Sequence, residues 1–521
     1  MYVIMHAYVL RLFFYYFFSL LKGRAYLREK KFWVNLLASI FIGLIIGAFV
    51  LAFKIFYTWL NIQTWHSGYD ASTMTTLCTG QWWWVGVGAG GGVIVGLLKI
   101  IYTYLAEEEF PIKQPSFISE LNALECPNHK LPFIVILIAA ISIGCGASVG
   151  PESAVCLMGS VVGALTARHY GSLVDLREHS EIFILIGISA GFGAVFPSPI
   201  MSTLCIQEVT QLMSTAMLKL KDYSTVELVV LTGIAGCSSF SVFTGVRDST
   251  LLAYQQLPAA DYNVYDTPGV DTWLKYNVYA IPLGVLCGIV GLIGIFILQL
   301  TNELGTFTRI FFNKIGSYFN CPYAFGTFFT PVVGGALSGL VTVIAPLTIG
   351  IGNETIEALI SHNIAYTIGA LLGTCFFKFL ATGICLGFGF IGGNMFAYLV
   401  AGVSLGLTLF KLIPGVSLIF LVPCCFSAVP CCIIPGIFSV TMLISITLTL
   451  GPKATTPVFI ASFVSYSTVS GVGIIQNMVI AGRATQEKNC KEYRSKIQCE
   501  FSTEASKLGR VQSTRLVIII L

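Results

Sequence analysis

Long apolar stretches alternate with short polar breaks over most of the chain, from about residue 32 to residue 470. Many of these stretches run for roughly 18–30 residues without a charge, which is long enough to cross a bilayer as a helix. Glycine or proline interrupts several others, so we expect short or broken helices there. The predicted helices span residues 32–61, 82–105, 114–125, 131–147, 151–168, 181–195, 199–217, 225–244, 274–303, 327–346, 353–362, 365–388, 394–411, 416–428, 434–450 and 455–470.

A polar, acidic loop divides the predicted helices into two sets. Lysine and arginine cluster on both flanks of the apolar region, which predicts a cytoplasmic location for both ends. We therefore divide the chain into an N-terminal cytoplasmic or interfacial segment, a first membrane repeat, the polar loop, a second membrane repeat and a short C-terminal tail, at residues 1–31, 32–245, 246–272, 273–483 and 484–521.

The two sets of helices repeat each other in sequence. The segments that begin at Trp84, Ser119, Gly150 and Phe196 resemble, in the same order, those that begin at Pro331, Glu354, Gly392 and Pro430. Each partner follows after a similar interval of roughly 235–247 residues. Internal repeats with interrupted helices are a common plan for transporters, whose substrate site then lies where the repeats meet. The pattern leaves open whether the repeats are inverted.

The composition identifies the class of protein. Hydrophobic residues make up 55% of the 521 residues and charged residues 10%, with a mean hydropathy of +0.83. Soluble globular proteins contain about 25% charged residues. We therefore predict an all-α polytopic membrane protein that lies among membrane lipids. The formal net charge of +4 comes mostly from the tails and gives no ground for a nucleic-acid partner.

The sixteen cysteines predict neither a metal site nor a cofactor. Most of them lie inside apolar segments, as small buried hydrophobic residues do. The pairs Cys424/Cys425 and Cys431/Cys432 lack the histidine and carboxylate neighbours of a metal site. An intramembrane enzyme is disfavoured because no apolar span carries a pair of histidines, and a cation transporter because none carries paired acids.

One carboxylate, Glu152, stands in an otherwise uncharged stretch at residues 144–159. Gly150 and Pro151 precede it, and proline fits the first position of a helix. A helix that begins at membrane depth offers free N–H groups that attract anions. An acid at this point either is an ordinary favourable residue at a helix start or competes with an anion for that site. Because ionisable groups inside membranes are costly and functional by default, we favour an anion pathway gated by Glu152.

These residues resemble the motifs of the CLC family of chloride channels and chloride/proton antiporters. Gly150-Pro-Glu-Ser-Ala resembles the family motif Gly-Lys/Arg-Glu-Gly-Pro, and residues 190–200 resemble its Phe-Asn-Ala-Pro-Leu helix. Lys378, followed by Gly392-Gly-Asn-Met-Phe-Ala, resembles the segment that ends in Gly-x-Phe-x-Pro, although Ala397 replaces the motif proline. The resemblance covers roughly residues 32–483 and implies a CLC-type inverted repeat of many tilted, partly broken helices.

The resemblance also assigns roles to individual residues. It makes Glu152 the gate, and it places Pro115 on the position of the central anion-binding serine, with Ser116 beside it. Gln476 is the nearest candidate by spacing for the pore tyrosine of the family. The anion-binding set that it implies is Gly150, Pro151, Asn394, Met395, Phe396, Ser116 and Pro115.

Three further residues are candidates for a role in anion transport or in proton relay. Lys378 either pairs with an acid or carbonyl groups or supplies a positive field beside the anion route. The position of the second, proton-relaying acid of family antiporters falls on Val209, with Glu208 next to it. Glu208 therefore either serves in proton relay or is a structural residue near a helix end.

The resemblance implies transport of chloride or other small anions by a homodimer, without enzymatic activity. We predict a voltage-gated or passive chloride channel. The alternatives are a chloride/proton antiporter and a nitrate-permeable variant, because nitrate-preferring relatives carry proline at the position matched by Pro115. About 38 residues follow Arg483, too few for the pair of cytoplasmic cystathionine-β-synthase domains of some relatives. Which membrane holds the protein stays open.

Overall fold

The computed structural model describes residues 30–65, 70–107, 110, 131–170, 180–196, 198–212, 225–246, 270–319, 322–434 and 436–470. Over these residues the structure is helical and has no strand, apart from one isolated bridge between Gly150 and Gly393. The predicted all-α class is confirmed. The helix expected at residues 114–125 lies outside the described residues.

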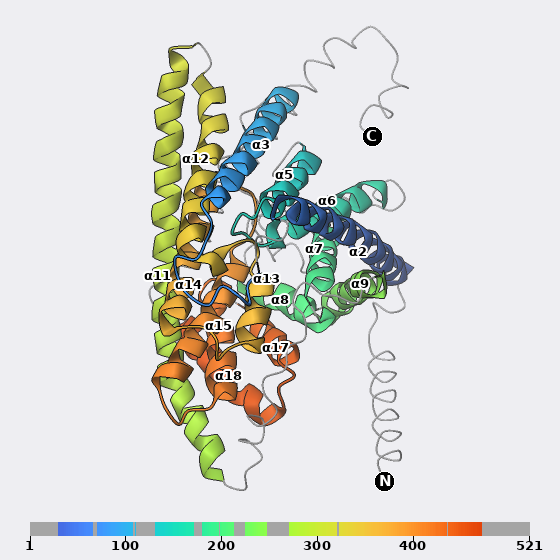
Figure 1. Ribbon diagram of the computed structural model, residues 1–521. Helices are drawn as coiled ribbons and strands as arrows, with labels where there is room; N and C mark the ends of the chain where they lie inside the picture. Colours follow the sequence, from blue (N-terminus) through green and yellow to red (C-terminus); the bar gives the residue numbers. More distant parts are fainter. Residues whose placement is uncertain are drawn as a thin grey trace.

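The helices fall into two groups along the chain (Figure 1). The first group consists of α2 (Lys30–Trp65), α3 (Trp83–Ala106), α5 (Pro132–Gly144), α6 (Glu152–Tyr170), α7 (Ser180–Val195), α8 (Pro199–Leu212) and α9 (Thr225–Val246). The second consists of α11 (Val270–Ser317), α12 (Pro322–Ile344), α13 (Asn353–Ser361), α14 (Ile368–Gly387), α15 (Met395–Leu412), α16 (Leu418–Ala428), α17 (Ile437–Thr447) and α18 (Pro452–Ser470).

Six of the described helices are long and apolar enough to cross a membrane, judged by length and composition. They lie at Phe32–Trp65, Trp83–Ala106, Trp273–Ser317, Ala324–Ile344, Ile368–Gly387 and Met395–Leu412. Shorter apolar helices of 10–17 residues, among them Glu152–Ala167 and Ile437–Thr447, complete the interior.

The longest helix, α11, extends well beyond its predicted end at residue 303. It continues to Ser317 because residues 304–317 contain no proline and keep an apolar face. On that face Phe312 stacks on Phe329 of α12 with ring centroids 5.3 Å apart. The tertiary contact with α12 therefore stabilises the part of α11 that lies beyond residue 303.

Two repeat-related glycine segments pack against each other across the halves of the chain. Helix α3 leaves the first group and lies along α12 (Figure 1). A Cβ added at Gly88 would lie 2.3 Å from the carbonyl oxygen of Gly335, and one added at Gly335 would lie 2.0 Å from that of Gly88. Larger side chains would force the helices apart, so the glycines permit this close approach of two backbones.

Candidate functional site

Two short linkers meet in the interior, one before α6 and one before α15. The N–H of Gly150 donates to the carbonyl of Gly393 at 2.8 Å, and the N–H of Gly393 donates back to that of Gly150 at 2.7 Å. The Ser153 hydroxyl donates to the Gly392 carbonyl at 2.9 Å. These bonds hold together the N-terminal ends of two helices from opposite halves of the chain.

Glu152 lies at this junction and is 5% exposed. As the first residue of α6, it reaches across to the start of α15, where the backbone N–H of Phe396 donates to Oε1 at 3.0 Å. The other oxygen, Oε2, is buried without a hydrogen-bond partner among the described residues. A buried carboxylate with one unsatisfied oxygen is costly to the folded protein.

The carboxylate lies against two glycines. A Cβ added at Gly150 would lie 2.0 Å from Oε2, and one added at Gly393 would lie 2.1 Å from the same atom. Neither distance is compatible with a side chain larger than hydrogen. The glycines therefore create the space that Oε2 occupies, a role for Gly393 that the sequence reasoning missed although the Gly392-Gly393 pair was visible.

The start of α15 presents backbone N–H groups to the carboxylate. Asn394 precedes the helix and makes no side-chain capping bond. The side chains of Met395 and Phe396 are 4% and 0% exposed, so they pack in the interior. The helix N-terminus carries a partial positive charge that favours any anion placed there, whether the carboxylate or a free ion.

An aromatic stack lies behind this helix start. The Phe396 ring stacks on Phe196 with centroids 6.2 Å apart, and Phe196 stacks on Phe192 at 5.6 Å. Sequence reasoning missed these rings as a group. The four-residue spacing of Phe192 and Phe196 places both on one helical face and is the signal that would have suggested the contact.

This arrangement agrees with the comparison to known families. The model of the voltage gated chloride channel family matches residues 91–470, which is most of the chain. The chain belongs to this family. It is an integral, multi-pass membrane protein, in keeping with its apolar helices.

Individual relatives of the voltage gated chloride channel family are distant. Chloride channel protein CLC-f of Arabidopsis thaliana is 21% identical over 328 residues, which cover 61% of this chain and 36% of that protein. The chain thus aligns with little more than a third of the length of this curated relative.

Solved structures share the fold. A slow cyanobacterial Cl⁻/H⁺ antiporter has a TM-score of 0.62 at 18% identity, covering 87% of this chain and 99% of its own. A CLC-type fluoride/proton antiporter follows with 0.58 at 16% identity, covering 83% and 95%. A eukaryotic CLC transporter has 0.56 at 13% identity, covering 86% and 73%.

Lys378, on α14, binds carbonyl groups. It is completely buried, and its Nζ donates to the carbonyls of Thr348 at 3.0 Å and Gly350 at 2.7 Å. These carbonyls belong to the connection before α13. The contacts correspond to the structural role considered for this lysine, and a field beside an anion route stays a prediction.

Glu208, near the end of α8, binds the start of another helix. The backbone N–H of Phe438 donates to Oε1 at 2.7 Å, and that of Ser439 donates to Oε2 at 2.8 Å. Both N–H groups belong to the first turn of α17, which otherwise has no side-chain cap. Glu208 therefore caps α17 with both oxygens.

The remaining predicted site residues fall where the structure gives no description. Pro115, Ser116 and Gln476 lie outside the described residues, and the same holds for the side chain of Val209. Within the described ranges, no group of histidine, cysteine, aspartate and glutamate is placed to hold a metal ion.

Proposed function

We propose that this protein moves small anions, chloride first among them, across a membrane through a pathway that Glu152 opens and closes. The observation that carries the proposal is the position of its carboxylate. It occupies the N-terminal end of α15, where an anion would bind, with one oxygen bonded and one not. The relatives are described as proteins for chloride or fluoride, two small anions.

The mechanism follows from competition for the same N–H groups. Ionised, the carboxylate accepts from Phe396 and fills the space beside Gly150 and Gly393. Protonation removes its charge and with it most of the attraction to the helix N-terminus. The side chain then swings away, and an anion takes its place on the same backbone donors. Partial charges bind the anion weakly enough for rapid release.

The pathway is a channel in our primary proposal, because Glu208 is held as a helix cap by two backbone donors. A group so bound is poorly placed to carry protons to Glu152. The second candidate is a chloride/proton antiporter. It is favoured by the fold similarity to two proteins described as Cl⁻/H⁺ and fluoride/proton antiporters. We also propose a homodimer, by analogy with the family.

The test is chloride flux from liposomes that contain the purified protein, measured across a range of pH. We expect flux of the native protein to rise as pH falls, because protonation releases the carboxylate. Glu152→Gln should abolish this pH response, while Glu303→Gln, on the exposed surface of α11, should preserve it. A pH response that survives Glu152→Gln would refute the gate.

The same liposomes distinguish the two candidates. A proton-sensitive dye reports whether protons move when a chloride gradient is imposed. Chloride flux without proton movement supports the channel, and a reversal potential that shifts with the pH gradient supports the antiporter. Replacing chloride with nitrate in the same assay decides the open question of anion preference.

A further inference from the structure

The linker that leads to Glu152 is held along its length as well as at its junction with α15. It follows Gly144, the last residue of α5, and ends at the start of α6. Its last part, at Gly150, pairs with Gly393 as described above. The part before Gly150 makes further hydrogen bonds, and two of these lead to one face of α14.

The first of these contacts with α14 is direct. The hydroxyls of Ser148 and Thr382 share a hydrogen bond, with their oxygens 3.1 Å apart. Both side chains are buried, at 2% and 0% exposure. Ser148 lies in the linker, four residues before Glu152, and Thr382 lies on α14. This bond therefore ties the linker to α14 just ahead of the carboxylate.

The second contact starts from Lys378, which lies one turn before Thr382 on the same face of α14. Its ammonium donates to the carbonyls of Thr348 and Gly350, at 3.0 and 2.7 Å. The backbone N–H of Gly350 in turn donates to the carbonyl of Gly146 in the linker, at 3.0 Å. A buried charge on α14 thus reaches the linker through one short peptide segment.

That peptide segment has an unusual backbone, which the ammonium helps to hold. Gly350 has φ +58° and Gly352 has φ +104°, both in the left-handed region that favours glycine. A Cβ added at Gly352 would lie 3.3 Å from Nζ of Lys378 and 2.5 Å from the side chain of Val400 on α15. Because hydrogen bonds from a charged donor are stronger than neutral ones, the lysine fixes a turn that contacts both the linker and α15.

The end of α2 confines the same part of the linker. The Thr64 hydroxyl donates to the carbonyl of Gly144 at 2.9 Å. A Cβ added at Gly146 would lie 2.3 Å from the ring of Trp65, and Gly146 has φ +81°. The carbonyl that accepts from Gly350 therefore belongs to a residue with little room to move.

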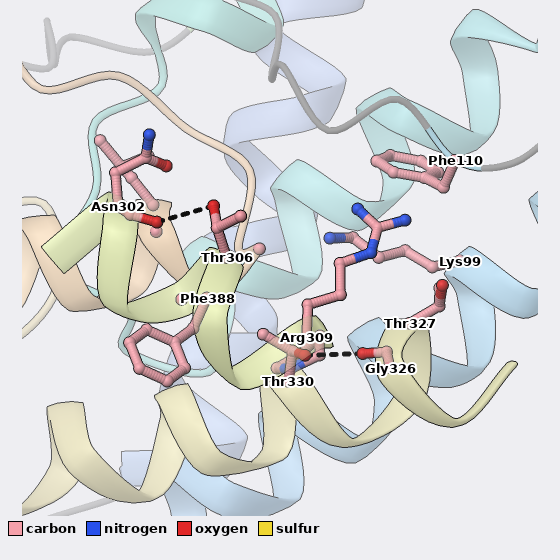
Figure 2. Close-up of a pocket in the computed structure, with 14 residues that line it drawn as sticks. Lys99, Phe110, Asn302, Thr306, Arg309, Gly326, Thr327, Thr330 and Phe388 are labelled. Carbon is pink, nitrogen blue, oxygen red and sulfur yellow. Dashed lines mark hydrogen bonds between the residues drawn. The ribbon is translucent and has the colours of Figure 1, made fainter. Parts of the chain in front are cut away.

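Besides the lysine of α14, other titratable side chains contact the two linkers that meet at the junction. Lys99 of α3 and Phe388, the residue after α14, line one cavity beside the linker to α15 (Figure 2). The thiol of Cys385 meets the backbone N–H of Ser148, and Cys145 lies in the linker to α6 itself. A test of how the linker is held must therefore change no charge, which the substitution of a hydroxyl permits.

We propose that Lys378 and Thr382 are positioning residues for the gate. Together they hold the linker so that the carboxylate of Glu152 lies at the start of α15. Lys378 acts through the peptide at Gly350, and Thr382 acts through Ser148. The proposal rests on the transport function proposed above, and it gives α14 a mechanical role in the position of the gate.

The pH profile of chloride flux from liposomes tests these roles. A weaker hold on the linker destabilises the closed position of the ionised carboxylate, so less protonation opens the gate and the midpoint moves to higher pH. We expect Thr382→Val to raise the midpoint by about 0.5 pH unit, which corresponds to a hold about threefold weaker. Lys378→Met should raise it by about one pH unit, for a hold about tenfold weaker.

Two matched variants serve as controls. Thr374→Val also removes a buried hydroxyl from α14, but this hydroxyl donates to the carbonyl of Ala370 within the same helix. Lys411→Met also removes an ammonium that donates to two carbonyls, those of Ile364 and Tyr366, at the far end of α15. Both variants should keep the native midpoint.

Three further variants show whether the hydroxyl acts through its partner. Thr382→Ser keeps the hydroxyl and should restore the native midpoint. Ser148→Ala should shift the midpoint as Thr382→Val does, and the double variant should shift it no further, because both changes remove the same bond. The proposal is wrong if Thr382→Val and Ser148→Ala leave the midpoint where Thr374→Val leaves it. These neutral variants decide the matter even if Lys378→Met does not fold.

Hydrogen exchange separates the hold on the linker from the gate itself. Exchange of the amides of residues 144–151 reports on the linker whether or not Glu152 is a gate. We expect faster exchange in Thr382→Val than in Thr374→Val. If this difference is present but the pH response of flux survives Glu152→Gln, the gate is wrong while α14 still holds the linker. If Glu152→Gln abolishes the response but neither midpoint nor exchange depends on Thr382, the positioning role is wrong and the gate stands.

Discussion

Two carboxylates of this protein meet helix N-termini in different ways. Glu152 and Glu208 both come from the first half of the chain, and each reaches the start of a helix in the second half. Glu208 uses both of its oxygens on successive N–H groups of α17. Glu152 uses one oxygen on α15 and leaves the other buried without a partner among the described residues.

The difference shows that carboxylates at two helix starts are held to different degrees. A carboxylate with both oxygens bonded at a helix start is a stable cap. One that is half bonded and buried remains in place only while its attraction to the helix exceeds its burial cost. The number of donors that each oxygen finds, rather than the helix end itself, distinguishes the two carboxylates.

The largest expected effect is on transport, at the glycines that accommodate Oε2. Gly393→Ala would place a Cβ 2.1 Å from this atom, so the carboxylate could not occupy its site. We expect the change in chloride flux across the pH range to become at least about tenfold smaller. This corresponds to about 1.4 kcal/mol of lost carboxylate binding. The pH response is measured as chloride flux from liposomes that contain the variant.

A second variant makes this result specific. In a Glu152→Ala background the Oε2 atom is absent, so adding Gly393→Ala should change flux little. Gly369→Ala is the control, because a Cβ there would meet no atom within 4 Å. Equal effects of Gly393→Ala with and without Glu152 would show that the alanine disturbs the linkers rather than the carboxylate.

The next effect concerns stability and belongs to the cap. Glu208→Ala removes the acceptor for two N–H groups of α17. We expect it to lower the free energy of unfolding by about 2 kcal/mol, from the loss of a charged cap. Unfolding in mixed detergent micelles measures the loss. Glu208→Gln keeps one acceptor oxygen and should cost about half as much; no loss in either variant would contradict the cap.

Removing the other carboxylate should affect stability less. Glu152→Ala loses the bond to Phe396 but also relieves the burial of an unsatisfied oxygen. These terms oppose each other, so we expect a change within about 1 kcal/mol, of either sign. The same unfolding assay applies. A loss as large as that of Glu208→Ala would mean that both carboxylates are structural, and the contrast between them would fail.

Much of this contrast could be predicted from the sequence. Glu152 stood out because an acid in an apolar stretch is rare, and the Gly150-Pro151 start located its helix. The repeat placed Asn394 opposite it. The first two signals are local residue patterns, and the third is an internal repeat. Both kinds of signal can be read from a single sequence.

The rest depends on contacts between distant residues. The cap formed by Glu208 joins residues 230 and 231 positions apart, and no pattern within either helix announces it. The partners of Lys378 are carbonyl groups, which every residue possesses, so sequence cannot single them out. The predicted length of α11 was wrong for the same reason, since its last turns are stabilised by packing on α12.

The smallest expected effect is a dependence of stability on chloride, and it sharpens the contrast most directly. If Glu152 occupies an anion site, Glu152→Ala leaves the N–H groups of α15 open to chloride. Bound ligand stabilises the folded state by RT ln(1 + [L]/Kd), or about 1.4 kcal/mol when chloride exceeds its Kd tenfold. We therefore expect chloride to raise the melting temperature of Glu152→Ala above that in gluconate at equal ionic strength. Glu208→Ala should show no such gain over the native protein, because α17 would lose a cap and not gain an anion site. A gain of equal size in both variants would mean that chloride binds any uncapped helix start. The hypothesis that Glu152 occupies a specific anion site would then be wrong.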